Sequence, residues 1–371
     1  MPMFYQIGNA VSKPGTIQYG RLEAVPHPTG SADFFPVIIA QSHKDGPCLW
    51  LTTGIHGNEH AGPLVIHSLI NQKLLDKMQG TIIAVPALNP AGLRTSRRKS
   101  YYDNTDPNRL WPDGRPEKKP DPNDRPPSAL ELAFCNLFDL IKKTADFLID
   151  YHNLGINSIS FAIRDRVLYR PPEGRSEAEA RDLAGRLNAM VHAYGHTVIT
   201  EFSASHYIAS KMHRSVAGSV LLSAGIPAFT AELGTGLMPD PAIIKAACIG
   251  TRNVLRWASM LDDETEPVHG ITLLKPSFPV RRLRYPYLQE ACVVEHLVQP
   301  GDRITPGTPL AALRDIWGRP LPKDVLYSEQ DGFILARSEG IYYYPGEFLY
   351  TAAVKDEFPL IGTYPKEYFD E

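Results

Sequence analysis

Hydrophobic and polar residues alternate along this chain in two different ways, and the change comes near residue 265. Up to that point, short apolar runs bounded by turn residues alternate with longer stretches in which apolar residues recur every three or four positions. The short runs are typical of strands and the longer stretches of amphipathic helices. The expected strands are 34–41, 47–55, 81–88, 145–153, 197–204 and 226–234, and the expected helices are 59–75, 128–143, 176–194 and 241–261. This alternation predicts an α/β domain with a largely parallel sheet flanked by helices.

Beyond residue 265 the helical periodicity disappears. Short β-type runs remain, separated by turn sequences such as QPGD (299–302) and YPGE (344–347). Such spacing predicts a small all-β unit. We therefore expect an α/β catalytic domain over 1–265 and a C-terminal β domain over 266–371.

A polar stretch from Asn89 to Pro127 interrupts the first domain. It is too long for a simple connection, and long loops in compact domains are usually functional. Its last part, 113–127, is an insertion dense in proline.

Composition narrows the class of protein. The net charge is −3, and no run of basic residues is present, which argues against nucleic acid or an anionic membrane as the main partner. The chain starts without a signal-peptide pattern and contains no apolar stretch of membrane-spanning length. Four widely spaced cysteines form no C-x-x-C pair. A cytoplasmic protein with reduced thiols is expected.

The strongest chemical signal is the segment Gly54–His60, where a strand ends and a helix is expected to begin. There His56 and Glu59, three residues apart, can face one point and hold a metal ion. A capping glutamate with a surface histidine is the structural alternative. The same residues also fit an inverted zincin pattern, with His56 and His60 as ligands, but Gly57 makes a helix interior unfavourable.

A third ligand is expected at the end of another strand. His152 follows the apolar run 147–149, and Asp150 lies on the same side of that strand, where it could orient the imidazole. A buried core histidine is the alternative. Two imidazoles and one carboxylate would leave a tetrahedral zinc ion with an open position for water.

Other side chains would complete a hydrolytic site. Glu232 follows an apolar strand and precedes a glycine turn, so it could be the general base for a zinc-bound water. The long loop supplies arginines for an oxyanion and for a substrate carboxylate. A structural glutamate and a solvated basic loop are the alternatives.

Four motifs occur in a fixed order: GIHGNE (54–59), NPAGLRTSRR to DPNRLWP (89–112), DYHN (150–153) and AELG (231–234). Over about 45–250 this order resembles the succinylglutamate desuccinylase/aspartoacylase family of the zinc carboxypeptidase superfamily. The resemblance implies a zinc-carboxypeptidase-like mixed sheet followed by a barrel-like β domain. The insertion 113–127 and the segment 206–214 match no part of this pattern.

The resemblance also implies a role for each matched position. One zinc ion per chain would be held by His56, Glu59 and His152, and Glu232 would be the general base. The remaining roles concern the loop: Arg98, or its neighbour Arg97, would stabilise the oxyanion, and Asn108 with Arg109 would bind the substrate carboxylate. A tyrosine from 342–344 is a further candidate for substrate contact.

The leading functional prediction is hydrolysis of a small N-acylated amino acid by this zinc site. A metallocarboxypeptidase acting on short peptides is the first alternative, and a non-catalytic binding protein with a vestigial site is the second. The expected partner is a small substrate that carries a carboxylate, without nucleic acid or membrane. The sequence leaves open the acyl group, the amine and whether the chain forms a homo-oligomer.

Overall fold

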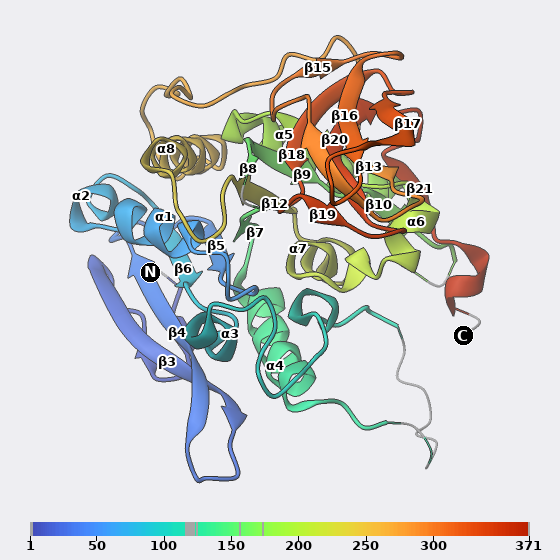
Figure 1. Ribbon diagram of the computed structural model, residues 1–371. Helices are drawn as coiled ribbons and strands as arrows, with labels where there is room; N and C mark the ends of the chain where they lie inside the picture. Colours follow the sequence, from blue (N-terminus) through green and yellow to red (C-terminus); the bar gives the residue numbers. More distant parts are fainter. Residues whose placement is uncertain (1–2, 116–122, 124, 156, 173, 370–371) are drawn as a thin grey trace.

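The computed structural model describes residues 3–115, 123, 125–155, 157–172 and 174–369. One mixed sheet of thirteen strands runs through it (Figure 1). Along the sheet the strands are β15 (Arg303–Ile304), β18 (Gly332–Arg337), β20 (Phe348–Lys355), β13 (Val280–Tyr287), β11 (Val198–Thr200), β9 (Ser160–Arg164), β12 (Ala228–Leu233), β7 (Phe147–His152), β5 (Cys48–Thr53), β6 (Thr81–Val85), β4 (Ala32–Gln41) and β3 (Thr16–Pro26), with β8 (Asn157–Ser158) paired to β18.

The centre of the sheet is parallel, since β12, β7, β5 and β6 all run in one direction. Antiparallel neighbours, β9 on one side and β4 with β3 on the other, make the whole sheet mixed. The strand ends of β5, β7 and β12 therefore meet at one edge, where an open α/β sheet usually binds its ligands.

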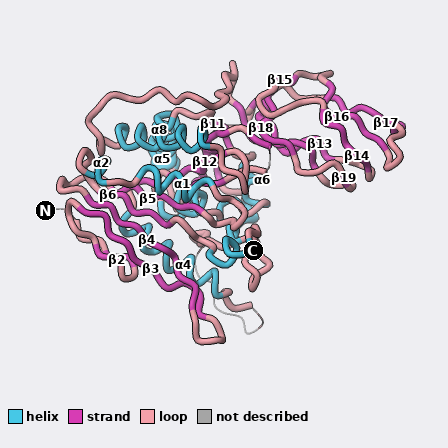
Figure 2. The backbone as a smooth tube through the Cα atoms, turned by 60° about the vertical axis from the view of Figure 1, so that its left-hand side comes forward, coloured by secondary structure: helices cyan, strands magenta, loops and turns pink. Residues whose placement is uncertain are grey.

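Helices cover both faces of the central strands (Figures 1 and 2). On one face, α1 (Ala61–Leu69) and α5 (Glu177–Tyr194) both pack against α8 (Pro241–Trp257). On the other face lie α4 (Ala129–Thr144), α7 (Val216–Ser219) and the π-helical turn η3 (Val220–Ala224). Both α4 and α5 begin with a serine-glutamate capping box, which in α4 is formed by Ser128 and Glu131.

The structure corrects the helix expected over 59–75. Glu59 lies in a loop, α1 begins at Ala61, and a second short helix, α2 (Gln72–Leu75), follows a break. The break occurs because Ile70 is extended and the side chain of Asn71 accepts a hydrogen bond from Leu74 N, which starts the new helix.

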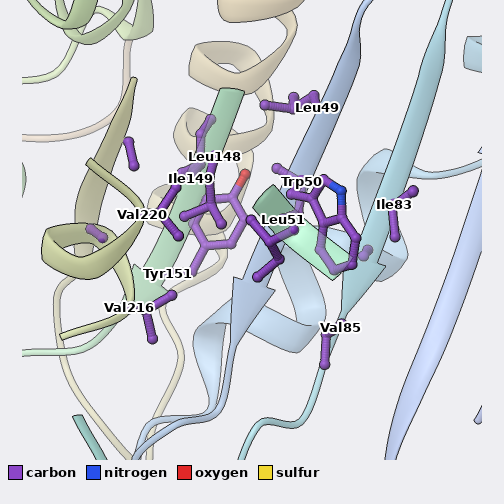
Figure 3. Packing of buried hydrophobic residues seen from close by; sticks show 14 of the residues in the cluster. Leu49, Trp50, Leu51, Ile83, Val85, Leu148, Ile149, Tyr151, Val216 and Val220 are labelled. Atoms are coloured by element: carbon purple, nitrogen blue, oxygen red, sulfur yellow. The ribbon is translucent and has the colours of Figure 1, made fainter. Parts of the chain in front are cut away.

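The main core lies between the central strands and the helices. Trp50, Leu51, Leu148 and Ile149 are fully buried, and Figure 3 shows Trp50 on the side of Ile83 and Ile149 on the side of Val220 of the helical face. Strands covered on both faces need continuous apolar runs rather than alternation, which explains the sequence pattern of these segments.

Smaller elements complete the fold, and two of them come from the C-terminal end of the chain. They are β1 (Gln6–Ile7), β2 (Ala10–Val11), α3 (Pro90–Thr95), η1 (Pro107–Arg109), β10 (Val167–Tyr169), α6 (Ala204–Ala209), η2 (Met212–Arg214), β21 (Ile361–Thr363) and η4 (Lys366–Phe369). No helix among the described residues is long and apolar enough to cross a membrane.

The C-terminal part has its own antiparallel sheet, which projects from the helix-covered body in Figure 2. Its order is β17 (Pro320–Tyr327), β16 (Pro309–Arg314), β14 (Cys292–His296) and β19 (Tyr342–Tyr343). A separate core that includes Leu310, Leu349 and Tyr350 supports it. The predicted fold class is thus confirmed, while β13, β18 and β20 also extend the main sheet. The domain division at residue 265 stays a prediction.

Candidate metal centre and active-site cavity

Two imidazoles and a carboxylate converge at the edge of the central strands. Each of His56, Glu59 and His152 offers one potential ligand atom, and these atoms all lie within 4.8 Å of one another. All three side chains are buried. Glu59 stands between the rings: its Oε1 is 2.7 Å from His56 Nδ1 and its Oε2 is 2.9 Å from His152 Nδ1. This donor set, two imidazole nitrogens and a carboxylate, is that of a catalytic zinc site.

The loop that carries His56 depends on two glycines. Gly54 has a φ of 69°, in the region that favours glycine, and this lets the chain turn directly after β5. A Cβ atom on Gly57 would lie 1.9 Å from the carbonyl carbon of Gly92, so the loop can pack against α3 only with glycine there. Glu59 N donates to His56 O at 3.2 Å, which holds both ligands in one turn.

His60 does not join this cluster. Its Nε2 lies 3.0 Å from the carbonyl oxygen of Gly57, and the whole segment 56–60 precedes the helix. The helical geometry that the inverted zincin pattern requires is therefore absent from this segment.

His152 is fixed from behind by the residue that the sequence suggested. Asp150 Oδ2 lies 2.7 Å from His152 Nε2, and the Thr52 hydroxyl donates to Asp150 Oδ1 at 2.8 Å. Nδ1 of His152 is thereby left to face Glu59. Asn153, to which the sequence analysis gave no role, donates its backbone N–H to Glu59 Oε2 at 3.0 Å.

Glu232 lies beside the cluster because β12 and β7 are parallel neighbours and pair Glu232 with His152. Its Oε2 is buried and has no hydrogen-bond partner among the described residues. Burial, together with the negative charge of Glu59, raises the pKa of Glu232 to about 7, and the nearby His152 opposes the shift. An unpaired carboxylate at this place could accept a proton from a water on the metal.

Arg98 reaches the cluster, and Arg97 does not line the same cavity. The Arg98 guanidinium lies 3.6 Å from Glu59 Oε1 and donates to Asp106 Oδ2 at 2.8 Å. Asp106 in turn lies 3.1 Å from His56 Nε2. Burial alone would raise the pKa of Asp106, but His56 and Arg98 hold it well below its usual value. No role was predicted for Asp106 from the sequence, although it is the first residue of the DPNR turn.

Asn108 and Arg109, which follow in the same turn, make different kinds of contact. Asn108 is held in place, with Nδ2 3.5 Å from His152 Nε2 and Oδ1 accepting from Val216 N at 2.9 Å. Arg109 donates to the carbonyl oxygens of Ser210 and Asn108 and makes no ion pair with a carboxylate among the described residues. Its charge is therefore available for an anionic group in the cavity.

Comparison with known proteins decides the family. The model of the succinylglutamate desuccinylase/aspartoacylase catalytic domain matches residues 45–258. The chain belongs to this family. A curated relative, N-alpha-acetyl-L-2,4-diaminobutyric acid deacetylase of Halomonas elongata, is 24% identical over 314 residues, 82% of this chain and 81% of that protein.

Solved structures agree in fold. The product-bound ectoine utilization protein of Ruegeria pomeroyi has a TM-score of 0.72 at 18% identity and covers 91% of this chain and 95% of its own. The succinylglutamate desuccinylase/aspartoacylase of Rhodobacter sphaeroides has a TM-score of 0.70 at 19% identity and covers 92% and 96%. The match of the family model to residues 45–258 confirms the family resemblance of the four sequence motifs.

The cavity of this desuccinylase/aspartoacylase family member has a volume of about 380 Å³ and extends well beyond the side chains of His56, Glu59 and His152. Met212, within the segment 206–214 that matched no family motif, lines it, as do Arg282 and Arg284 of β13. None of the tyrosines 342–344 is among the described lining residues. Most of the insertion 113–127 lies outside the described residues.

Two buried acids in the cavity were missed by the sequence analysis. Asp165 and Glu201 each come one residue after a strand, β9 and β11. A single acidic residue at the end of an apolar strand was the available signal, and the same signal had singled out Glu232.

Proposed function

We propose that this protein is a zinc-dependent hydrolase that cleaves the amide bond of a small N-acylated amino acid. The observation that carries the proposal is the buried cluster of His56, Glu59 and His152 beside Glu232, whose buried Oε2 has no hydrogen-bond partner in the described part of the chain. The name of the Halomonas relative, an acetyl diamino acid deacetylase, supports the same reaction class.

His56, Glu59 and His152 would hold one zinc ion per chain. Bound zinc would supply a Lewis acid and a water that is acidic enough to attack a carbonyl near neutral pH. A cytoplasmic location, a small carboxylate-bearing substrate, and no nucleic-acid or membrane partner belong to the same proposal.

The chain's own residues divide the remaining work. Glu232 accepts a proton from the attacking water and returns it to the leaving nitrogen, so that the amine departs neutral. Arg98 lies beside Glu59 and donates to the oxyanion that forms on the acyl carbonyl. Arg109, whose charge is unpaired among the described residues, binds the substrate carboxylate.

The first experiment is a hydrolysis screen with zinc-loaded protein. N-acetyl, N-succinyl and N-formyl amino acids are compared with short peptides that have a free C-terminus. Turnover of acylated amino acids is expected. Preferential cleavage of the peptides would favour a carboxypeptidase, and no cleavage of any amide would favour a binding protein.

The second experiment separates chemistry from metal binding. Glu232→Gln should retain zinc and lose about 10²–10⁴-fold in kcat, the usual contribution of a general base. Glu290→Gln, which makes the same change at an exposed position, should behave as wild type. A Glu232→Gln protein with normal turnover would remove Glu232 from the mechanism.

A further inference from the structure

The two segments that match no family motif, 113–127 and 206–214, meet at a second cavity. This cavity has a volume of about 470 Å³ and is lined mainly by the segment 206–214, together with Arg115 and the C-terminal residues Pro365 and Tyr368. Figures 1 and 2 show α6 and the C-terminal end of the chain on the same side of the molecule. None of its described lining residues also lines the catalytic cavity, so the two spaces are separate.

Positive charge is concentrated in the second cavity. Arg115, Lys211 and Arg214 line it, and no acid is among its described lining residues. The two arginines have carboxylates behind them: Arg115 Nε lies 3.0 Å from Asp113 Oδ2, and Arg214 Nη2 lies 3.4 Å from Glu131 Oε1.

These carboxylates balance the charge only in part. Glu131 is shared, because its Oε2 also lies 2.7 Å from Arg125 Nη2. Lys211 is exposed, and its side chain makes no ion pair or hydrogen bond within the part of the chain that the structure describes. Its ammonium group therefore offers a full charge and three N–H donors to an anion that enters the cavity.

The backbone of Lys211 adopts a conformation that does not favour lysine. Its φ is 53°, in the left-handed region, where a side chain costs free energy and glycine does not. The turn before η2 would therefore form more readily with glycine. What lysine adds at this position is its charged side chain.

The wall beside the cations combines apolar surface with unpaired polar atoms. The rings of His213 and Tyr368, which are 4% and 6% exposed, meet edge to face with their centroids 4.9 Å apart. His213 Nδ1 and the Tyr368 hydroxyl oxygen are buried and have no hydrogen-bond partner among the described residues. Ile208 and Pro365 add apolar surface. Such a wall suits a ligand with an organic part next to its anionic group.

The turn η2 separates the second cavity from the catalytic one. Lys211 and His213 line the second cavity, whereas Met212 between them lines the catalytic cavity. A ligand that orders this turn from one side therefore acts on a wall of the other cavity.

Hydrogen bonds connect the same turn to Arg109, the proposed cation for the substrate carboxylate. Arg109 Nε donates to Ser210 O at 2.9 Å. Two residues further along each segment, Trp111 N donates to Arg214 O at 3.2 Å and Arg214 Nε donates to Trp111 O at 3.1 Å. The position of Arg109 thus depends on how the residues around η2 are held.

We propose that the second cavity binds an organic phosphate, which strengthens substrate binding through Arg109. A phosphate monoester carries about two negative charges near pH 7 and can accept charge-assisted hydrogen bonds from Arg115, Lys211 and Arg214. Its organic part would lie on the aromatic and apolar wall. With the turn held in this way, Ser210 O would keep Arg109 in place before substrate arrives, which lowers the cost of binding. The effect on substrate rests on the proposed function, whereas the phosphate site does not.

Calorimetry with zinc-loaded protein tests the site without any turnover. Phenyl phosphate is compared with inorganic phosphate, which lacks the organic part, and with phenol, which lacks the charge. Phenyl phosphate should bind tightest and phenol should not bind measurably. Equal affinity for the two phosphates would overturn the organic part of the proposal, and no binding of either would overturn the site.

The variant Lys211→Gln keeps most of the side-chain length and removes its charge. It should keep the wild-type Tm and bind phenyl phosphate about tenfold more weakly or worse, because a charge-assisted contact is lost. Lys323→Gln, the same change at an exposed position of β17, is the matched control and should bind as wild type does. Unchanged binding in Lys211→Gln would place the phosphate elsewhere, for example at the metal, and overturn the site.

Kinetics test the connection to Arg109. With saturating phenyl phosphate, KM for an N-acetyl amino acid should fall about threefold while kcat stays within about twofold, since binding and not chemistry is affected. The response should disappear in Lys211→Gln and persist in Lys323→Gln. A KM that stays constant or rises while phenyl phosphate is bound would overturn the connection. If no amide is cleaved but phenyl phosphate binds and Lys211→Gln abolishes this, the proposed hydrolysis fails and the phosphate site stands.

Discussion

Removing Asp150 should weaken metal binding although this residue is not one of the three proposed metal ligands. Asp150 is completely buried between two partners, with Oδ2 2.7 Å from His152 Nε2 and Oδ1 2.8 Å from the Thr52 hydroxyl oxygen. Its carboxylate fixes the ring so that His152 Nδ1 faces Glu59. Carboxylates behind a metal-bound histidine usually contribute 10- to 100-fold to metal affinity.

Asp150→Asn and Asp150→Ala should lower the zinc affinity by different amounts. Asp150→Asn can keep both contacts, because the amide oxygen can accept from His152 and the amide nitrogen can donate to Thr52. It loses the negative charge, so a loss of about tenfold in zinc affinity, or about 1.4 kcal/mol, is expected. Asp150→Ala removes both contacts. The loss should approach 100-fold, or about 2.7 kcal/mol, with a lower free energy of unfolding because buried polar groups remain unpaired.

The assay is competition for zinc against a chromophoric chelator near neutral pH, with thermal unfolding as the check on folding. Thr52→Val is the matched control, since it removes one contact to Asp150 and leaves the carboxylate in place. Its loss of affinity should be smaller than that of Asp150→Ala. If folded Asp150→Ala held zinc as tightly as wild type, the orienting role of Asp150 would be refuted.

Three further predictions concern other parts of the molecule. Arg109→Ala should raise KM for carboxylate-bearing substrates on the order of tenfold to 100-fold, because a charge-assisted pair is lost; equal KM values would remove Arg109 from carboxylate binding. Gly57→Ala should lower both zinc affinity and Tm, since its Cβ would overlap the backbone of Gly92, and a wild-type Tm would contradict this reason. The pKa of His196 is lowered by burial to about 4, so the unfolded chain takes up its proton first as the pH falls below about 6.5. Stability should therefore fall between pH 6.5 and 4, by up to about 3 kcal/mol from this group. His196→Phe should flatten that slope in urea unfolding, and an unchanged slope would assign it to other groups.

The central site was predictable because each part of it is local in sequence. His56 and Glu59 share one turn whose glycines mark it, and His152 and Glu232 each stand at the end of an apolar strand. Parallel strands bring such ends to one edge, so the sheet type alone placed these groups close together.

The rest of the cavity depends on pairing between distant segments. Asp165, Glu201 and Arg282 meet only because β9, β11 and β13 are neighbours in one particular register. Register between strands is set by burial and packing over the whole sheet, and no local pattern encodes it. The contribution of the C-terminal part to the cavity through Arg282 and Arg284 was missed for the same reason.

Helix boundaries near the site show the same limit. Apolar periodicity continues through 59–75, but the Asn71 cap divides the segment into two helices. The choice between Arg97 and Arg98 likewise needed the fold, since adjacent residues in a loop point in different directions and only Arg98 reaches Glu59.

Metal content, measured after zinc loading and dialysis, tests the central claim most directly. Wild-type protein should hold about one zinc ion per chain, and folded His56→Ala and His152→Ala should each hold much less and lose amide hydrolysis with it. A wild type without zinc, or a His152→Ala protein that still holds one zinc ion per chain and cleaves its substrate, would contradict the account.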